Sequence, residues 1–370
     1  GNFLRFLCEK LELTKVQVFI TSSPLTMSYA FGLEDKISGS VKSELVYPPF
    51  EPQPSNDIRL NESIIKQLQK KDLLLSYPYE SMNPFLKLLK EAAYDNSVIS
   101  IKISIYRLAK NAKIVDYLCA AAENDKDVTV LIELRARFDE QNNIDWSQRL
   151  EQAGCRIIYG FEGYKVHSKV CLITRRERGK ISYITQIGTG NYNEKTSKQY
   201  TDFSLMTSDM EIGTDANEFF KNMAIGSLEG NYSTLLVAPN SMKSKIIELI
   251  DREISKGTKG RIFVKFNSIS DLTLINKLAE ASLAGVNIQM IVRGICCILP
   301  QVEGKTDNIF IKSIVGRYLE HSRIYLFGSG NDEIMYISSA DFMTRNMDKR
   351  VEVGCPIKDK YVKEKIMHFI

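Results

Sequence analysis

The chain carries one ordered set of residue patterns twice, and this internal repeat limits the folds that it can adopt. Four elements of the first half return in the same order in the second half. In pairs they are 128–135 and 286–293, His167-Ser-Lys169 and His321-Ser-Arg323, Gly188-Thr-Gly-Asn191 and Ser338-Ser-Ala-Asp341, and Asp202 and Glu352. Self-similarity at a long, slowly drifting spacing indicates duplicated structural units. We therefore predict two homologous halves related by a pseudo-twofold axis.

Strand-like and helical segments alternate along both halves. Runs rich in β-branched residues at 98–106, 128–134, 261–266 and 286–294 are typical of buried strands. Between them lie amphipathic segments such as 84–93 and 242–257, whose apolar spacing favours helices. This β–α–β order predicts an α/β fold in which each half is a mixed β-sheet flanked by helices.

The composition is that of a globular protein and excludes several other classes. Hydrophobic residues form 44% of the chain and charged residues 25%, unlike a disordered, collagen-like or coiled-coil protein. No apolar run is long enough to cross a bilayer. The net charge of +4 is too small to indicate a nucleic-acid or membrane partner by itself. Seven cysteines without zinc-ligand spacing favour free thiols in a reducing cytoplasm.

A proline-rich stretch indicates how the chain is divided. Four prolines lie within residues 47–55, which excludes a helix there. We expect residues 1–46 to be the remnant of a helical domain, residues 47–56 a linker, residues 57–232 the first half and residues 233–370 the second. The chain lacks an initiator Met and opens with a helical pattern, so we expect a fragment of a longer protein.

Two of the three histidines occupy equivalent places, each two residues before a cation and next to a predicted strand. Residues i and i+2 of a strand project from one face, so His167 points with Lys169, and His321 with Arg323. If the halves pack about a pseudo-twofold axis, both pairs meet in one cleft. A single histidine beside a buried strand most often only satisfies a carbonyl group. The duplication favours a functional role for both.

Arginines at the ends of predicted strands suit an anionic ligand. Arg107, Arg137 and Arg293 each end or follow an apolar strand. Ligands of α/β sheets bind beyond the carboxyl ends of the strands, where guanidinium groups can make bidentate contacts to phosphate. Internal ion pairs with Glu133 or Asp139 are the alternative for at least one of the three.

Nearby cations would also make the histidines suitable for phosphoryl chemistry. Positive charges lower the pKa of an imidazole, and a neutral ring is a nucleophile near neutral pH. One histidine can then attack phosphorus while the other transfers a proton at the leaving group. The chain has neither a P-loop nor a protein-kinase catalytic loop.

The duplicated His-x-cation elements resemble the phospholipase D superfamily, with one departure. Its usual motif carries Asp seven residues after the histidine, where this chain has Thr174 and Gly328. The chain resembles class-1 polyphosphate kinases more closely, over nearly its whole length. The longest matching segments are 187–207, 313–325 and 338–353.

The resemblance to class-1 polyphosphate kinases implies reversible transfer of the γ-phosphate of ATP to inorganic polyphosphate through a phosphohistidine. It implies that His167 is the nucleophile and His321 the second active-site histidine. The expected ATP and phosphate contacts are Arg107, Arg137, Lys169, Tyr200, Arg293 and Arg323. Arg107 and Arg137 are associated with Mg²⁺, which phosphate oxygens and water would hold because guanidinium is not a metal ligand.

The resemblance also implies a cytoplasmic bacterial protein that forms a homo-oligomer at full length and has no nucleic-acid partner. Peripheral association with a membrane stays open. Two other functions compete with the kinase: a phospholipase D-like phosphodiesterase or nuclease, and a non-catalytic module that binds polyanions.

Overall fold

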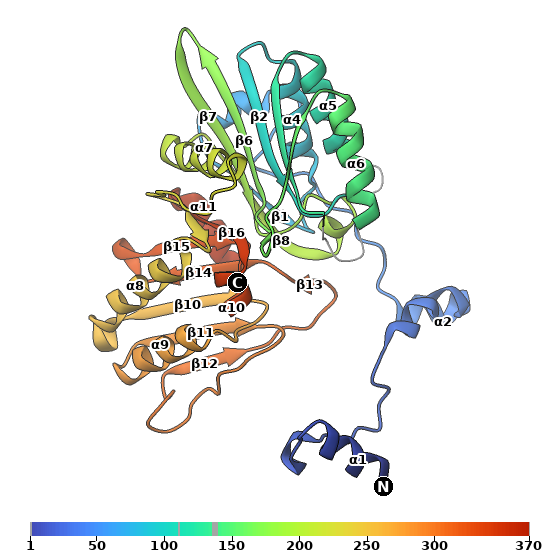
Figure 1. The fold of residues 1–370 in the computed structure, drawn as a ribbon, viewed down its shortest axis with the longest axis vertical. Coiled ribbons are helices and arrows are strands. Elements are labelled where there is room, and N and C mark those ends of the chain that lie inside the picture. Colours follow the sequence, from blue (N-terminus) through green and yellow to red (C-terminus); the bar gives the residue numbers. More distant parts are fainter. Residues whose placement is uncertain (1, 110–111, 135–139, 370) are drawn as a thin grey trace. The chain divides into compact units, whose positions relative to one another are not determined.

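The computed structural model describes residues 2–109, 112–134 and 140–369, and the chain forms two compact units, Gly1–Phe50 and Glu51–Ile370. The smaller unit contains the helices α1 (Asn2–Lys10) and α2 (Gly39–Leu45), neither of which has a fully buried residue. The other α-helices and all strands belong to the larger unit (Figure 1). Among the described residues, no helix is long and apolar enough to cross a membrane.

The larger unit contains two eight-stranded sheets, counted over the described residues. Seven strands of each sheet follow the same order, and the eighth is a short strand from the other half. The first sheet runs β1 (Leu73–Tyr77), β8 (Tyr200–Thr207), β7 (Lys180–Gly188), β6 (Val170–Glu177), β2 (Val98–Ile105), β3 (Asp127–Ile132), β4 (Arg156–Tyr159). The second runs β9 (Leu236–Ala238), β16 (Arg350–Pro356), β15 (Ile334–Ser338), β14 (Arg323–Phe327), β10 (Arg261–Phe266), β11 (Asn287–Val292), β12 (Ile309–Lys312). Strand β1 therefore corresponds to β9, β2 to β10, and so on.

Both sheets are mixed in the same way. Strands β2, β3 and β4 are parallel, as are β10, β11 and β12, whereas β6 and β14 run antiparallel to their neighbours. The prediction of two homologous α/β halves with mixed sheets is therefore confirmed.

Helices cover both sheets (Figure 1), and an apolar cluster of buried side chains joins the halves. The helices of the first half are α3 (Ile64–Leu68), α4 (Asn83–Tyr94), α5 (Lys113–Glu123), α6 (Glu140–Gln152) and α7 (Met210–Ala224). Those of the second half are α8 (Met242–Ile254), α9 (Leu272–Leu283), α10 (Thr344–Asp348) and α11 (Lys360–His368). The shared cluster includes Phe219 of α7, Leu172 of β6, Ile324 of β14, Val351 of β16 and Ile366 of α11. Burial of these side chains stabilises the halves against each other.

Each half donates a two-residue strand to the sheet of the other half. Strand β5 (Lys165–Val166) pairs in parallel with β16, and β13 (Leu319–Glu320) pairs in parallel with β8. His167 follows β5 directly, and its backbone N–H donates to the Val351 carbonyl at 2.9 Å. His321 follows β13, and its N–H donates to Thr201 Oγ1 at 3.1 Å. The exchange therefore places both histidines where the two halves meet.

Candidate active site

Each imidazole is held by a carboxylate from the opposite half. His167 Nδ1 lies 2.9 and 3.0 Å from the two oxygens of Glu352, on β16. His321 Nδ1 lies 2.9 Å from both oxygens of Asp202, on β8. An ionised carboxylate only accepts hydrogen bonds, so it places the ring hydrogen on Nδ1 and leaves a lone pair on Nε2. The crossed pairing gives both rings the tautomer that a nucleophile or a base requires.

The two cations of the repeated triplets are buried in this site. Lys169 is 1% exposed and its ammonium group donates to the His167 carbonyl. Arg323 is 3% exposed, binds Asp341 through Nε and Nη2 at 3.2 Å each, and places Nη1 3.2 Å from His321 Nε2. In the described part of the chain, by contrast, no hydrogen bond reaches His167 Nε2. The lone pair of His167 is therefore the accessible one.

Both histidines are neutral near neutral pH. Burial lowers the pKa of His167 well below its usual value, and Lys169, Arg350 and Arg323 lower it further. The pKa of His321 is also lowered, mainly by burial, although Asp202 acts in the opposite direction. The direction agrees with the sequence-based prediction, but burial is a larger cause than the neighbouring cations that the prediction invoked.

The two carboxylates differ in their ionisation. Burial raises the pKa of Glu352 to about 7. The pKa of Asp202 is lowered although burial acts to raise it, because His321, Thr189 and Arg323 favour the charged form. Asp202 is therefore ionised at all pH values near neutrality, whereas Glu352 changes its charge there.

Tyr200 and Arg293 lie on the His321 side of the site. The ring centroids of Tyr200 and His321 are 5.2 Å apart. Arg293 follows β11, and its buried Nε has no hydrogen-bond partner among the described residues. Burial and the charge of Arg323 lower the pKa of Arg293. Because an unsatisfied buried donor costs about 1–3 kcal/mol, this guanidinium is suited to an anionic ligand.

Arg107 lies on the His167 side, and Arg137 lies outside the described residues. The Arg107 guanidinium is 5.4 Å from the centre of the Tyr106 ring. That ring contacts His167 edge to face, with 4.8 Å between the centroids. Six of the predicted contact and catalytic residues thus gather around the joint between the halves: Arg107, His167, Lys169, Tyr200, His321 and Arg323. Arg293 lies close enough to Arg323 for the charge of Arg323 to lower its pKa.

The sequence patterns left Arg350 without a role. It begins β16, its Nη1 is 3.7 Å from Glu352 Oε1, and its charge helps to lower the pKa of His167. Arg350 stands two residues before Glu352, as Tyr200 stands two residues before Asp202. This spacing is the signal from which its place could have been predicted.

The described residues do not form a protein cage for a metal ion. No group of three or more His, Cys, Asp or Glu side chains among them could hold one. Asp202 and Glu352 are both engaged by imidazole nitrogens. This donor set does not fit Mg²⁺, which prefers several oxygen ligands.

Gly190→Ala is expected to displace Asp202 and to destabilise the fold. A Cβ at residue 190 would overlap the Asp202 carboxylate and lie 2.9 Å from its Cβ. Asp202 cannot move freely because His321 and Thr189 hold it. Overpacking of this kind costs about 1–3 kcal/mol, which chemical denaturation would measure. Gly316→Ala is the control, since a Cβ at residue 316 would meet nothing within 4 Å and stability should not change. A Gly190→Ala protein as stable as wild type would contradict the expectation.

Comparison with known proteins gives consistent likenesses. Two family models match, polyphosphate kinase C-terminal domain 1 at residues 63–228 and C-terminal domain 2 at residues 235–370. A polyphosphate kinase of Staphylococcus haemolyticus is 44% identical over 370 residues, which cover 99% of this chain and 51% of that protein. The chain thus spans about half the length of this relative.

Solved structures give the same result. The crystal structure of a polyphosphate kinase from Porphyromonas gingivalis matches with a TM-score of 0.79 and 37% identity, over 88% of this chain and 55% of that one. A phosphatidylserine synthase of Haemophilus influenzae matches with a TM-score of 0.55 and 12% identity, over 82% of this chain and 88% of that one. The second likeness concerns the fold alone.

Proposed function

Because the chain belongs to the polyphosphate kinase family, we propose that it carries the site that transfers the γ-phosphate of ATP reversibly to inorganic polyphosphate. One observation supports the proposal most directly. His167 has its Nδ1 held by Glu352 and its Nε2 lone pair accessible, beside the buried cation Lys169. A neutral nucleophile next to a positive charge is what phosphoryl transfer requires. Burial lowers the pKa of Lys169 to about 7, so this charge is lost as the pH rises above neutrality.

In the first step, His167 Nε2 attacks the γ-phosphorus of MgATP. The N–P bond forms, the bond between the γ-phosphorus and the bridging oxygen breaks, and ADP leaves with the electron pair. Glu352 stabilises the positive charge that the ring acquires, because it accepts the Nδ1 hydrogen bond. Lys169, Arg107 and Arg293 neutralise the equatorial oxygens, and we assign Arg137 the same role from the family resemblance.

In the second step, a terminal oxygen of polyphosphate attacks the phosphorus and the electron pair of the N–P bond returns to His167. His321 accepts the proton of the terminal phosphate at Nε2, and Asp202 keeps the ring hydrogen of His321 on Nδ1. Arg323 lies 3.2 Å from that Nε2 and can also bind the incoming chain. We assign Tyr200, whose ring centroid is 5.2 Å from that of His321, to contact with the nucleotide from the family resemblance.

The direct test is mass spectrometry of the full-length protein after exposure to MgATP. We expect one phosphohistidine, at His167, that is acid-labile and base-stable. Modification at another residue, or none in a protein that turns over ATP and polyphosphate, would refute the mechanism.

The rate of His167 phosphorylation is expected to fall as the pH decreases below about 7. Burial raises the pKa of Glu352 to about 7, so its protonated fraction grows below that pH. A protonated carboxyl group donates to Nδ1, which moves the ring hydrogen to Nε2 and removes the nucleophilic lone pair. The rate should drop about tenfold per pH unit once Glu352 is mostly protonated. Rapid-quench measurement of the labelling rate at a series of pH values checks this expectation. A labelling rate that does not change below pH 7 would contradict it.

The competing functions make different predictions. A phospholipase D-like phosphodiesterase or nuclease would cleave DNA or phospholipid without ATP. A non-catalytic module would bind polyphosphate, weaken with salt and keep its affinity when both histidines are replaced by alanine. Turnover of MgATP and polyphosphate that depends on His167 excludes both.

For the full-length protein we further propose a bacterial cytoplasmic location and a homo-oligomeric state. We take residues 57–232 and 233–370 as its two catalytic halves and residues 1–46 as the end of an upstream helical domain. Analytical ultracentrifugation of the full-length protein would test the oligomeric state.

A further inference from the structure

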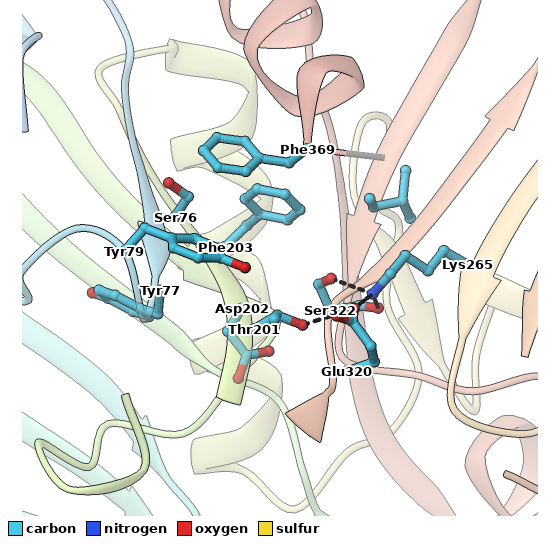
Figure 2. A pocket seen from close by; sticks show the side chains of 11 residues that line it. Ser76, Tyr77, Tyr79, Thr201, Asp202, Phe203, Lys265, Glu320, Ser322 and Phe369 are labelled. Atoms are coloured by element: carbon cyan, nitrogen blue, oxygen red, sulfur yellow. Dashed lines mark hydrogen bonds and ion pairs between the residues drawn. The ribbon is translucent and has the colours of Figure 1, made fainter. Parts of the chain in front are cut away.

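A buried lysine of the second half binds both residues that flank His321. Lys265 lies on β10 and is 5% exposed. Its Nζ is 2.8 Å from Glu320 Oε2 and donates to Ser322 Oγ at 2.7 Å and to the Ser322 carbonyl at 3.3 Å (Figure 2). The ammonium group thus uses its three donors on the residue before His321 and the residue after it.

Thr201, in the first half, contacts both Glu320 and His321. Its hydroxyl donates to Glu320 Oε2 at 3.1 Å and accepts from the backbone N–H of His321 at 3.1 Å. The next residue on β8 is Asp202, which binds His321 Nδ1. Lys265, Glu320 and Thr201 therefore connect β10, β13 and β8 around one imidazole, and Figure 2 shows these side chains converging.

The equivalent place in the first half is held by a neutral residue, Ser104. Lys265 pairs with Ile324 next to the second triplet, and the strand register gives Ser104 of β2 the corresponding place. Ser104 donates to the Ser168 carbonyl at 3.0 Å and accepts from Ser168 Oγ at 3.3 Å. Val166, which precedes His167, has an apolar side chain, and its backbone N–H donates to Glu133 Oε2 at 2.8 Å. The Glu133 carboxylate thus holds the backbone before His167, whereas the side chain before His321 takes part in the ion pair of Lys265 and Glu320.

A contribution to stability alone does not explain this largely buried ion pair. Removing two charges from water usually costs about as much as their attraction returns, so such pairs are poor stabilisers but can fix a geometry. A cavity of about 40 Å³ lies beside Lys265 and Asp202. The neighbouring side chains would therefore have room to shift if the ammonium group were lost.

We propose that Lys265 is a positioning residue for His321. Its ammonium group binds Glu320 and Ser322 and thereby keeps β13 paired with β8. The imidazole of His321 then keeps its Nδ1 hydrogen-bonded to Asp202 and its Nε2 next to Arg323. The orientation of the ring follows from the geometry alone. The consequence for polyphosphate synthesis rests on the proposed function.

The test compares Lys265→Met with Ser104→Ala in the full-length protein. Nitrogen-15 NMR of the histidine rings without ATP should show wild-type His321 as a single Nδ1–H tautomer and the Lys265→Met ring as a mixture. The matched Ser104→Ala change should leave the His321 signals as in wild type. Polyphosphate synthesis by Lys265→Met should lose about 10- to 100-fold in kcat with little change in KM for ATP, as expected for a misplaced group.

Wild-type His321 signals and a kcat within about twofold of wild type in Lys265→Met would overturn the proposal. If Lys265→Met does not fold, Ser322→Ala removes one contact of the ammonium group and should show a smaller shift in the same direction. An unchanged His321 spectrum in that variant would likewise overturn the proposal. The NMR result does not depend on turnover, so it decides the role of Lys265 even if no phosphohistidine forms at His167.

Discussion

His167→Ala is expected to abolish the phosphoenzyme and to lower polyphosphate synthesis by about 10⁴-fold or more, as loss of a covalent nucleophile does elsewhere. The imidazole supplies the only accessible ring lone pair in the described part of the site. Alanine leaves Lys169 and Arg323 in place, so MgATP should still bind through charge. Trapping with γ-labelled ATP, followed by acid and base treatment, measures the loss.

His321→Ala is the matched control, because it removes the equivalent ring of the other half. It should still form labelled His167, since Glu352 and Lys169 are untouched. Discharge of the label to polyphosphate should slow by about 10²- to 10⁴-fold, the usual effect of losing a general acid or base. Acid-labile labelling that survives in His167→Ala and disappears in His321→Ala would reverse the assignment of the nucleophile.

The repeat and the strand patterns were sufficient to predict the two mixed sheets. The run 261–266 combines β-branched and aromatic residues, a composition typical of strands, and β10 has these bounds. The exchange of β5 and β13 was not predictable, because a strand of two residues has no periodicity. Its pairing depends on the partner sheet, which lies far away in sequence.

The sequence predicted some residues of the site and missed others, because contacts between distant segments leave no local pattern. His167 and His321 stood out because the chain has few histidines and repeats their surroundings. Asp202 and Glu352 were recognised as equivalent positions, but their crossed contacts follow from the strand exchange. From the sequence, Lys265 looks like a solvent-exposed polar residue of a strand. Lysine is rarely buried unless it is paired, and the sequence does not reveal the partner. Its partners, Glu320 and Ser322, come from a distant segment.

Glu352→Gln is expected to lower the rate of His167 phosphorylation by about 10³- to 10⁴-fold while leaving the fold intact, as is typical of carboxylates that fix a catalytic tautomer. Ser339 donates a hydrogen bond to Glu352 Oε2, so the glutamine oxygen should take that place. The amide nitrogen then occupies the position of Oε1, 3.0 Å from His167 Nδ1, and the amide oxygen stays 2.9 Å from it. The neutral amide no longer balances the positive charge that the ring gains during attack, and its N–H donor competes with the hydrogen on Nδ1.

Asp202→Asn is the matched control for Glu352→Gln, because Asp202 holds the other ring. It should leave label formation at His167 largely intact and slow its discharge to polyphosphate. The pH dependence separates a tautomer effect from general damage. Because the pKa of Glu352 is about 7, the acid limb should disappear in Glu352→Gln and persist in Asp202→Asn. Burial lowers the pKa of Lys169 to about 7 as well, but lysine loses its charge as the pH rises and so does not produce an acid limb. A Glu352→Gln protein that keeps both the wild-type rate and the acid limb would show that this carboxylate does not control His167.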